Sequence, residues 1–458
     1  MKLKNVIPVV AAMRQVRNTP CLEPGRIRRL QSERLMRLLE YACARSPFYQ
    51  RKYWGLNPGT VPLAMLPITT KEEIRDHFDE VVTDPRIRWK DLETFTADDR
   101  NLGRWYLGEY AVSHSSGTQG RPLFIVHDRF ALARIISLMT ARSSRDGTPS
   151  TLQGIARLFR PQRITAISFR RGFYPSGMVL EYLPEMLAPF VRVTRLSSTD
   201  RDLCTRLIHS NPQVITGYAG VLEGLAIQNG PFEFPELQYI TTSSEQLLPR
   251  ARQRIEKAFG VPVFDHYGTG ECLQLADGCR HCGGVHVNAD WAILESVDEN
   301  GQAVPFETVG NRILITNLAN RVQPMIRYEV GDQVAIANHG CGPSNNLPLL
   351  TQIHGRTSDL LWIGAGEEKR FVSGIVFQSA MDSLPEIQDW RVEQRESNRL
   401  TVEIQLVPEL KSTGMDVSGL IPRRLYERGL PSVVTVDVDI VSAVLPDPKT
   451  GKVRRVVP

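Results

Sequence analysis

Residues 113–122 read SHSSGTQGRP, a stretch of hydroxyl side chains and glycines that ends in an arginine and a proline. Glycine lets backbone N–H groups turn toward a bound anion, and Ser or Thr hydroxyls add further hydrogen-bond donors. The stretch is therefore either a phosphate-binding loop or a plain surface loop, and its residues alone favour neither. The two common nucleotide patterns, G-x-x-x-x-G-K-[ST] and G-x-G-x-x-G, are both absent here.

Cysteines and a histidine gather within residues 272–286, which read CLQLADGCRHCGGVH. Their spacing is C-x6-C-x2-C-x3-H, and thiolate and imidazole ligands at short spacing are typical of tetrahedral Zn²⁺. The candidate ligands are Cys272, Cys279, Cys282 and His286, with His281 as an alternative. A zinc with four protein ligands would be structural, since no position stays open for catalysis. Unrelated reduced cysteines, or one reactive thiol, are the other interpretations. His339 and Cys341 form a second group that is too sparse to indicate a site.

Length and charge limit what kind of protein carries these residues. The chain has 458 residues, so two or more domains are expected. Its 55 Lys and Arg and 50 Asp and Glu are interspersed, which does not indicate a nucleic-acid-binding arm. No apolar run approaches the 18 residues or so of a membrane span, and the N-terminal apolar stretch does not favour a signal peptide. Seven cysteines do not make a disulfide scaffold, so we expect a reduced, cytoplasmic protein.

Apolar periodicity indicates the elements that position these residues. Residues 25–45 carry leucines at helical spacing, and Pro47 ends the pattern. Between about 110 and 300, strand-like runs alternate with amphipathic helices, which predicts an α/β domain with a largely parallel sheet. We therefore expect a large N-terminal domain over 1–359, opened by a helical segment of about 1–60. A small C-terminal α+β domain should follow over 360–458.

Further short motifs follow the first one along the chain. They are HYGTGE at 266–271, PMIRYEVGD at 324–332, HGRTSDL at 354–360 and PDPKTGKVRR at 446–455. Each is weak alone, but in this order the set resembles the adenylate-forming superfamily of acyl-CoA synthetases and adenylation domains. Residues 29–53 and 242–271 are most similar to the phenylacetate-CoA ligase-like family, so the resemblance runs nearly end to end.

The resemblance implies a two-step reaction that uses ATP and Mg²⁺. A carboxylate reacts with ATP to give an acyl-adenylate and pyrophosphate, and a thiol, most often that of CoA, then attacks the acyl carbon. It also implies a set of residues that bind the ATP phosphates, namely Ser115, Ser116, Gly117, Thr118, Gly120, Arg121 and Thr269. The chain departs from the usual motif at Arg121, where lysine is common, and at Gln119, where threonine is frequent.

The resemblance places another set of residues at the adenine and ribose. These are Ser243, Ser244, Glu245, Tyr267, Gly268, Asp332 and Arg356. Glu271 is implied as the ligand of Mg²⁺, a hard cation that suits carboxylate and phosphate oxygens. Each role has a plainer alternative, because residues 243–245 also fit a helix cap and Asp332 also fits a turn.

Two positions near the C-terminal domain complete the implied machinery. Asp359 matches the hinge of the family. Lys452 matches the catalytic lysine, which would stabilise the negative charge that develops during adenylation. The alternative for Lys452 is a solvated lysine in a basic tail, where Lys449, Arg454 and Arg455 are its neighbours.

Aromatic residues in the segments that match the acyl pocket favour an aromatic acid. Phe169, Tyr174 and Tyr218 are the candidates, although core packing is the commoner fate of such side chains. The leading hypothesis is thus an ATP-dependent acid–thiol ligase that uses CoA. The alternatives are transfer to an amine or a carrier-protein thiol, and a non-catalytic nucleotide- or zinc-binding module. We expect neither a nucleic-acid nor a membrane partner, and the sequence leaves a homodimer open.

Overall fold

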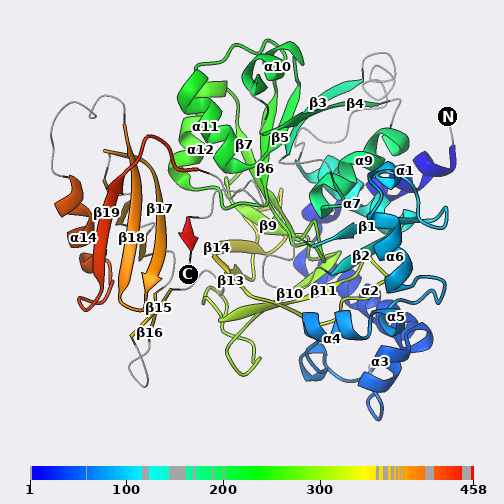
Figure 1. Cartoon of the computed structure of the whole chain (residues 1–458). Coiled ribbons are helices and arrows are strands. Elements are labelled where there is room, and N and C mark those ends of the chain that lie inside the picture. The colour runs from blue at the N-terminus through cyan, green and yellow to red at the C-terminus, as the bar shows by residue number, and fades with distance from the viewer. Residues whose placement is uncertain are drawn as a thin grey trace. The chain divides into compact units, whose positions relative to one another are not determined.

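The fold is taken from a computed structural model. It describes residues 3–57, 59–115, 123–143, 161–168, 172–187, 190–198, 200, 202–356, 361–364, 370–372, 376–377, 380–381, 383–384, 386–407, 417–445 and 455–457. The chain divides into two compact units, the first made of 1–330 and 335–352 and the second of 331–334 and 353–458. Figure 1 labels the elements of each unit.

The first unit opens with helices, of which α2 to α6 build one hydrophobic core with the first two strands. The helices are α1 (Leu3–Arg17), α2 (Pro24–Arg45), α3 (Pro47–Lys52), α4 (Lys71–Asp76), α5 (Phe78–Val81) and α6 (Trp89–Thr96), with 3-10 turns at Thr19–Cys21, Leu63–Met65 and Asp99–Asn101. The helix expected over 25–45 is confirmed as α2. Ser46 separates it from α3, because its hydroxyl accepts the backbone N–H of Tyr49 at the new helix start.

Strands and helices then alternate, as the sequence predicts. The strands are β1 (Tyr110–His114), β2 (Phe124–Asp128), β3 (Gln162–Ser168), β4 (Val191–Ser197), β5 (Val214–Gly217), β6 (Tyr239–Ser243) and β7 (Val263–Tyr267). The helices are α7 (Arg129–Ser143), α9 (Pro175–Leu187), α10 (Leu203–His209), α11 (Ala219–Asn229) and α12 (Pro249–Phe259). β1 and β2 form an antiparallel pair. β4, β3, β5, β6 and β7 are adjacent and parallel, which confirms the α/β fold class.

The parallel strands have two differently covered faces, because successive side chains point to opposite sides of a sheet. On one face, Ile215, Ile240 and Val263 pack against α10, α11 and α12, the helices that lie beside β5–β7 in Figure 1. The other face carries Ile164, Thr216 and other side chains that line a cavity with residues of α1, α7 and α9. This cavity belongs to the candidate site.

Seven further strands follow β7 in the part of this region that the structure describes. They are β8 (Ala276–Gly278), β9 (Val285–Val287), β10 (Ala292–Val297), β11 (Arg312–Asn317), β12 (Tyr328–Val330), β13 (Asp332–Ala337) and β14 (Leu349–Arg356). β8, β9 and β14 continue the large sheet in antiparallel pairs, with β13 at its edge. β10, β11 and β12 form a separate antiparallel sheet.

A buried charge cluster anchors the helices to the segment after β9. The ring of Trp291 is sandwiched between the guanidinium groups of Arg34 on α2 and Arg134 on α7, at 3.5 and 3.6 Å from its centroid. Next to it, the Asp290 carboxylate accepts two hydrogen bonds from Arg142 at 2.8 and 2.9 Å, and Arg34 lies 3.5 Å away. Both Asp290 and Arg142 are buried, so this pair is shielded from water.

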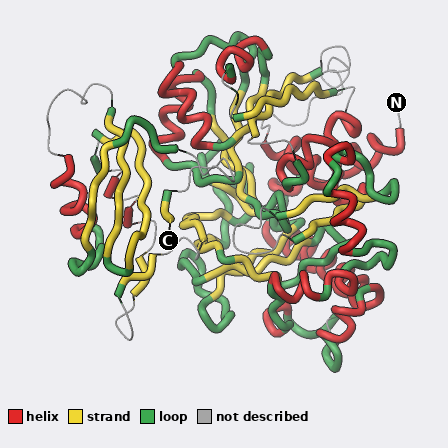
Figure 2. Tube along the Cα trace, in the orientation of Figure 1, coloured by secondary structure: helices red, strands yellow, loops and turns green. Residues whose placement is uncertain are grey.

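The second unit contains a small mixed sheet with its own core. Its elements are β15 (Leu361–Ile363), β16 (Arg370–Val372), β17 (Ile387–Glu396), β18 (Arg399–Leu406), α14 (Val417–Glu427), β19 (Thr435–Ile440) and β20 (Val456–Val457). Its four-stranded sheet has the order β19-β18-β17-β20, and Figure 2 draws the strands in yellow. The α+β content matches the expected small domain, and the boundary at 359 stays a prediction because 357–360 are outside the described residues. Among the helices that the structure describes, none has the length and hydropathy of a membrane span.

Candidate active site

The hydroxyl- and glycine-rich stretch begins at the end of β1. Ser115 and Leu123 join the two ends of this stretch. The backbone N–H of Ser115 donates to Leu123 O, and the Ser115 hydroxyl accepts the N–H of Leu123, both at 2.9 Å. His114 N donates to Phe173 O and ties the same point to the segment before α9. The other expected phosphate ligands in this stretch, Ser116, Gly117, Thr118, Gly120 and Arg121, lie outside the described residues.

Residues 243–245, which read Ser-Ser-Glu, begin at the carboxyl end of β6, and the backbone turns sharply there. Ser244 adopts a left-handed backbone with φ of 68°, a conformation that non-glycine residues adopt rarely. Glu245 then accepts the N–H of Gly220 in the first turn of α11 at 2.8 Å. A carboxylate at the N-terminal end of a helix accepts a backbone N–H that has no partner within the helix, and its negative charge is attracted to the positive end of the helix dipole. The capping alternative therefore holds for Glu245, although the helix that it caps is α11 and not α12.

A tight turn follows β7 at the neighbouring strand end. Thr269 and Cys272 bond each other's backbone, with N···O distances of 3.0 and 3.2 Å, and the Thr269 hydroxyl also accepts Cys272 N. Gly268 lies so close to the carbonyl of Leu273 that a Cβ there would overlap with it. The turn requires glycine at this position, and it holds Thr269 buried beside Glu271.

Glu271 is a buried carboxylate with a defined orientation. Tyr328 Oη donates to Glu271 Oε1 at 2.9 Å, and Asn317 Nδ2 donates to the backbone O of Glu271 at 3.0 Å. Oε1 thus has one donor, while no hydrogen bond to Oε2 is seen within the described part of the chain. Tyr328 lies in the RYEVGD motif, so the fold brings two of the motifs together at this carboxylate. A fixed carboxylate next to the turn that is expected to bind phosphate fits the needs of Mg²⁺.

A polar pair lies on the cavity face of β7. His266 Nδ1 donates to Asp277 Oδ1 on β8 at 2.6 Å, and Asn288 Nδ2 donates to Asp277 Oδ2 at 2.7 Å. Burial opposes protonation of His266, but the Asp277 carboxylate outweighs burial and raises the pKa of the imidazole. On the opposite face, burial raises the pKa of Asp265 to about 6, although Thr242 donates to its carboxylate.

A cavity of about 420 Å³ adjoins this turn. It begins at Ser243, Ser244 and Gly268 and extends under β3 and β5 to α9 and α1. Its volume is within the usual range for small-molecule pockets, and it lies at the carboxyl ends of parallel strands, where α/β proteins bind ligands. The arrangement can hold a small molecule whose reactive end lies at the turn of residues 268–272, called the motif turn below.

Comparisons with known proteins agree with this geometry. A phenylacetate-coenzyme A ligase of Thermus thermophilus is 27% identical over 354 residues, which cover 74% of this chain and 72% of that protein. Protein CapK of Staphylococcus aureus is 20% identical over 386 residues, covering 77% and 72%. A crystal structure of 2-hydroxyisobutyryl-CoA ligase in its postadenylation state superposes with a TM-score of 0.69 over 93% of this chain and 88% of that one, at 19% identity. No family model matches the chain.

The chain is thus similar in sequence to a phenylacetate-CoA ligase, and it shares the fold of an adenylate-forming CoA ligase.

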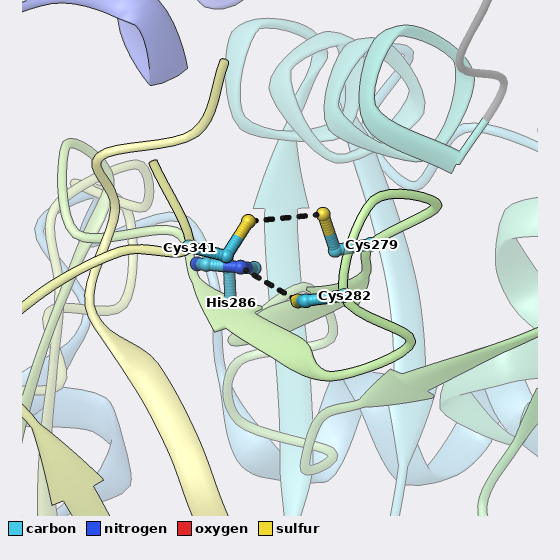
Figure 3. A group of neighbouring side chains, drawn as sticks. All are labelled: Cys279, Cys282, His286 and Cys341. Carbon is cyan, nitrogen blue, oxygen red and sulfur yellow. Dashed lines mark hydrogen bonds between the residues drawn. The ribbon is translucent and has the colours of Figure 1, made fainter. Parts of the chain in front are cut away.

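The structure also brings together four side chains that suit a metal in this chain. Ligand atoms of Cys279, Cys282, His286 and Cys341 all lie within 4.8 Å of one another (Figure 3). Cys279 and Cys341 have their sulfur atoms 3.7 Å apart, and Cys282 Sγ lies 3.4 Å from His286 Nε2. His286 Nδ1 donates to Leu347 O at 2.7 Å, which leaves Nε2 to face the thiols. A set of three thiols and one imidazole is typical of structural zinc.

Two loops supply these ligands. The β8–β9 turn carries Cys279 and Cys282, and it is shaped by Gly283 with φ of 67° and by a Gly284 N–H that points at Cys282 Sγ. The β13–β14 loop carries Cys341. Burial opposes ionisation of Cys279, but hydrogen bonds from His286 and backbone N–H groups lower the pKa of its thiol. Such a turn is already shaped to present thiolates to a metal.

The expected ligand Cys272 is not part of this group, and Cys341 takes its place. Cys272 belongs to the turn before β8 and is separated from Cys279 by that strand. It is buried, and burial raises the pKa of its thiol to about 12. His281, the alternative ligand, is also outside the group. In the sequence, Cys341 lies 62 residues from Cys279, in a group with His339 that is too sparse to indicate a site.

The remaining expected residues have varied positions. Asp332 is buried at the start of β13, within the second unit. Tyr218 lines the cavity, whereas Tyr174 packs with its ring 5.6 Å from that of His114. Three further residues, Phe169, Asp359 and Lys452, are outside the described residues, as is the side chain of Arg356.

Proposed function

We propose that the chain is an AMP-forming acid–CoA ligase. The observation that carries the proposal is the buried Glu271 carboxylate, which Tyr328 orients beside the Gly268–Thr269 turn, where the cavity opens. Similarity to known CoA ligases supports ATP and CoA as substrates. The CoA ligase names of the relatives support the acceptor, while an amine or a carrier-protein thiol is the alternative.

The motif turn and the cavity would divide the first half-reaction between them. The acid binds in the cavity with its carboxylate at Gly268, and the α-phosphate binds at Thr269. The carboxylate oxygen attacks the α-phosphorus, the bond to the β-phosphate oxygen breaks, and pyrophosphate leaves. Glu271 would hold Mg²⁺, which supplies charge neutralisation for the phosphates. Tyr328 keeps Glu271 in one orientation, so this charge is placed before the reaction begins.

In the second half-reaction, the CoA thiol loses its proton and its sulfur attacks the acyl carbon. AMP leaves and a thioester is formed. Lys452 is proposed to stabilise charge in the first half-reaction. Arg455, a neighbour in the same basic tail, already pairs with Asp389 and donates to Trp390 O at 2.9 Å. Val456 next to it pairs with Val392 in β17, so the chain is anchored four residues after Lys452.

We also propose a structural zinc at Cys279, Cys282, His286 and Cys341. The residues fit the ion, since all four donors converge and His286 is oriented by a carbonyl. The ion would cross-link the β8–β9 turn to the β13–β14 loop. β8 follows directly after the motif turn, so this cross-link would support the wall that carries Glu271.

The test is acid-dependent ATP–pyrophosphate exchange with a panel of carboxylic acids. We expect exchange in the wild type and a loss of about 10²–10³-fold in Lys452→Ala, the usual effect of removing one preorganised charge. Lys449→Ala, in the same tail, is the matched control and should retain exchange. A protein that binds ATP but shows no exchange with any acid would instead indicate a non-catalytic nucleotide-binding module.

A further inference from the structure

The cavity that adjoins the motif turn has a polar end and an apolar end. Ser168, Ser243 and His266 line it near the carboxyl ends of their strands, where the motif turn lies. Apolar side chains line its other parts, among them Met13 of α1, Met139 of α7, Leu183 and Leu187 of α9, Val191 of β4 and Val214 of β5. We propose that this cavity takes the alkyl chain of an aliphatic carboxylic acid. The proposal rests on the function proposed above and names the substrate class of that same site.

The cavity is long in the direction of the strands. On β6 both Ser243 and Tyr239 line it, and on β3 both Ser168 and Gln162 do. At about 3.3 Å per residue, these pairs span roughly 13 and 20 Å. A phenyl ring with a one-carbon side chain would fill only the part near the motif turn. An extended chain of eight or more carbons would use the whole length.

The walls also favour an alkyl chain over an aromatic ring. Aromatic ligands gain from stacked or edge-on aromatic neighbours, but the lining has only three aromatic rings among the described residues, those of Phe190, Tyr218 and Tyr239, against eleven leucine, isoleucine and valine side chains. Branched aliphatic side chains and two methionines dominate instead, and methionine adapts to flexible apolar ligands. Thr140 adds little polarity, because its hydroxyl already donates to Ile136 O at 2.8 Å.

Polar groups at one end and apolar groups at the other match an amphiphilic acid. The carboxylate would lie at Gly268, where the motif turn meets the cavity, and the tail would point toward α9 and β4. Each buried methylene contributes about 0.8 kcal/mol of transfer free energy. The kcat/KM for an acid should therefore rise with the length of its alkyl chain until the chain fills the cavity.

The experiment is a chain-length series on the intact protein. ATP–pyrophosphate exchange is measured with butanoate, hexanoate, octanoate and decanoate, and with benzoate and phenylacetate. We expect kcat/KM to rise roughly three- to fourfold per methylene, with octanoate well above both aromatic acids. A series that is flat in chain length, or a preference for phenylacetate, overturns the proposal.

A variant in the middle of the cavity makes the test specific. Ile164 on β3 is only partly buried and lines the cavity between Ala166 and Gln162. Ile164→Phe should lower the ratio of kcat/KM for decanoate to that for butanoate at least tenfold. Thr140→Leu on α7 should lower the same ratio, and it replaces the first variant if Ile164→Phe folds poorly. Ile208→Phe is the matched control, since Ile208 is exposed on α10, away from the cavity.

Calorimetric titration of the same acids distinguishes failure of the proposed activity from failure of the cavity inference. If no acid supports exchange but octanoate binds more tightly than butanoate and Ile164→Phe removes this preference, the cavity inference stands and the activity is wrong. If the acids neither react nor bind with chain-length dependence, the inference itself is wrong.

Discussion

Tyr328 shows how a single hydroxyl can orient the carboxylate that we propose to bind Mg²⁺. It is buried, and its Oη makes a 2.9 Å hydrogen bond to Glu271. We expect Tyr328→Phe to keep the packing and to lose this donor. A hydrogen bond to a charged group contributes about 1.5–3 kcal/mol, so exchange should fall about tenfold or more. The Mg²⁺ concentration for half-maximal rate should rise at the same time, which a titration of Mg²⁺ at saturating ATP measures.

Tyr53→Phe is a suitable control for that variant. The Tyr53 hydroxyl is also buried in the same core, but it has no hydrogen-bond partner among the described residues. Its loss should leave the Mg²⁺ requirement unchanged. An unchanged requirement in Tyr328→Phe as well would show that Glu271 needs no orientation by its neighbour.

The family resemblance implied roles for the motif residues but not for their partners. Glu271 and Gly268 belong to the contiguous HYGTGE motif, which is part of that resemblance, and their roles stay predictions. Tyr328, Asp277 and Asn288 act through contacts across strands, and such contacts have no spacing in the sequence to reveal them. The role of Glu245 as a cap of α11 was hidden for the same reason.

At the scale of elements, the proposed metal centre would join the β8–β9 turn to the β13–β14 loop. We expect the purified protein to contain about one zinc per chain. Cys341→Ala removes one of four ligands and should greatly reduce the zinc content, while Cys272→Ala should retain it, because Cys272 lies outside the group. Elemental analysis of both variants, purified without chelators, checks this. Zinc that is lost in Cys272→Ala and kept in Cys341→Ala would contradict the assignment.

Element types were largely predictable, since hydrophobic periodicity is a local property. The helix at 24–45 and the β/α alternation follow from it. The fourth cysteine was not predictable, because Cys341 reaches the group only when β14 pairs with β9 and the loop before it folds back. The composition of the cavity was also missed, since its walls come from α1, α7 and α9 as well as from the sheet.

For the whole molecule, Asp290 is a point where distant parts of the first unit meet. It holds Arg142 of α7 and lies close to Arg34 of α2, beside the Trp291 sandwich. Asp290→Asn would leave Arg142 buried without its counter-charge, which typically costs about 3–5 kcal/mol. We expect a clear loss in the free energy of unfolding by urea, read by tryptophan fluorescence.

The control for this variant is an ion pair at the surface. Asp98→Asn removes a carboxylate that pairs with Arg100 in full contact with water, so stability should not change measurably. Equal stability of the two variants would show that the buried cluster is not an anchor. Chain length indicated more than one domain, but this anchor was not predictable, because its charges are spread over more than 250 residues of sequence.

The 3.7 Å approach of the Cys279 and Cys341 sulfur atoms has a consequence for handling the protein. Without a metal, two neighbouring thiols are open to oxidation, and a disulfide between them would fix the two loops by a covalent bond instead of a coordinate one. Protein that has been treated with a chelator and kept in air would then not bind zinc until a reductant was added. Metal content and redox history are therefore coupled in any preparation of this chain.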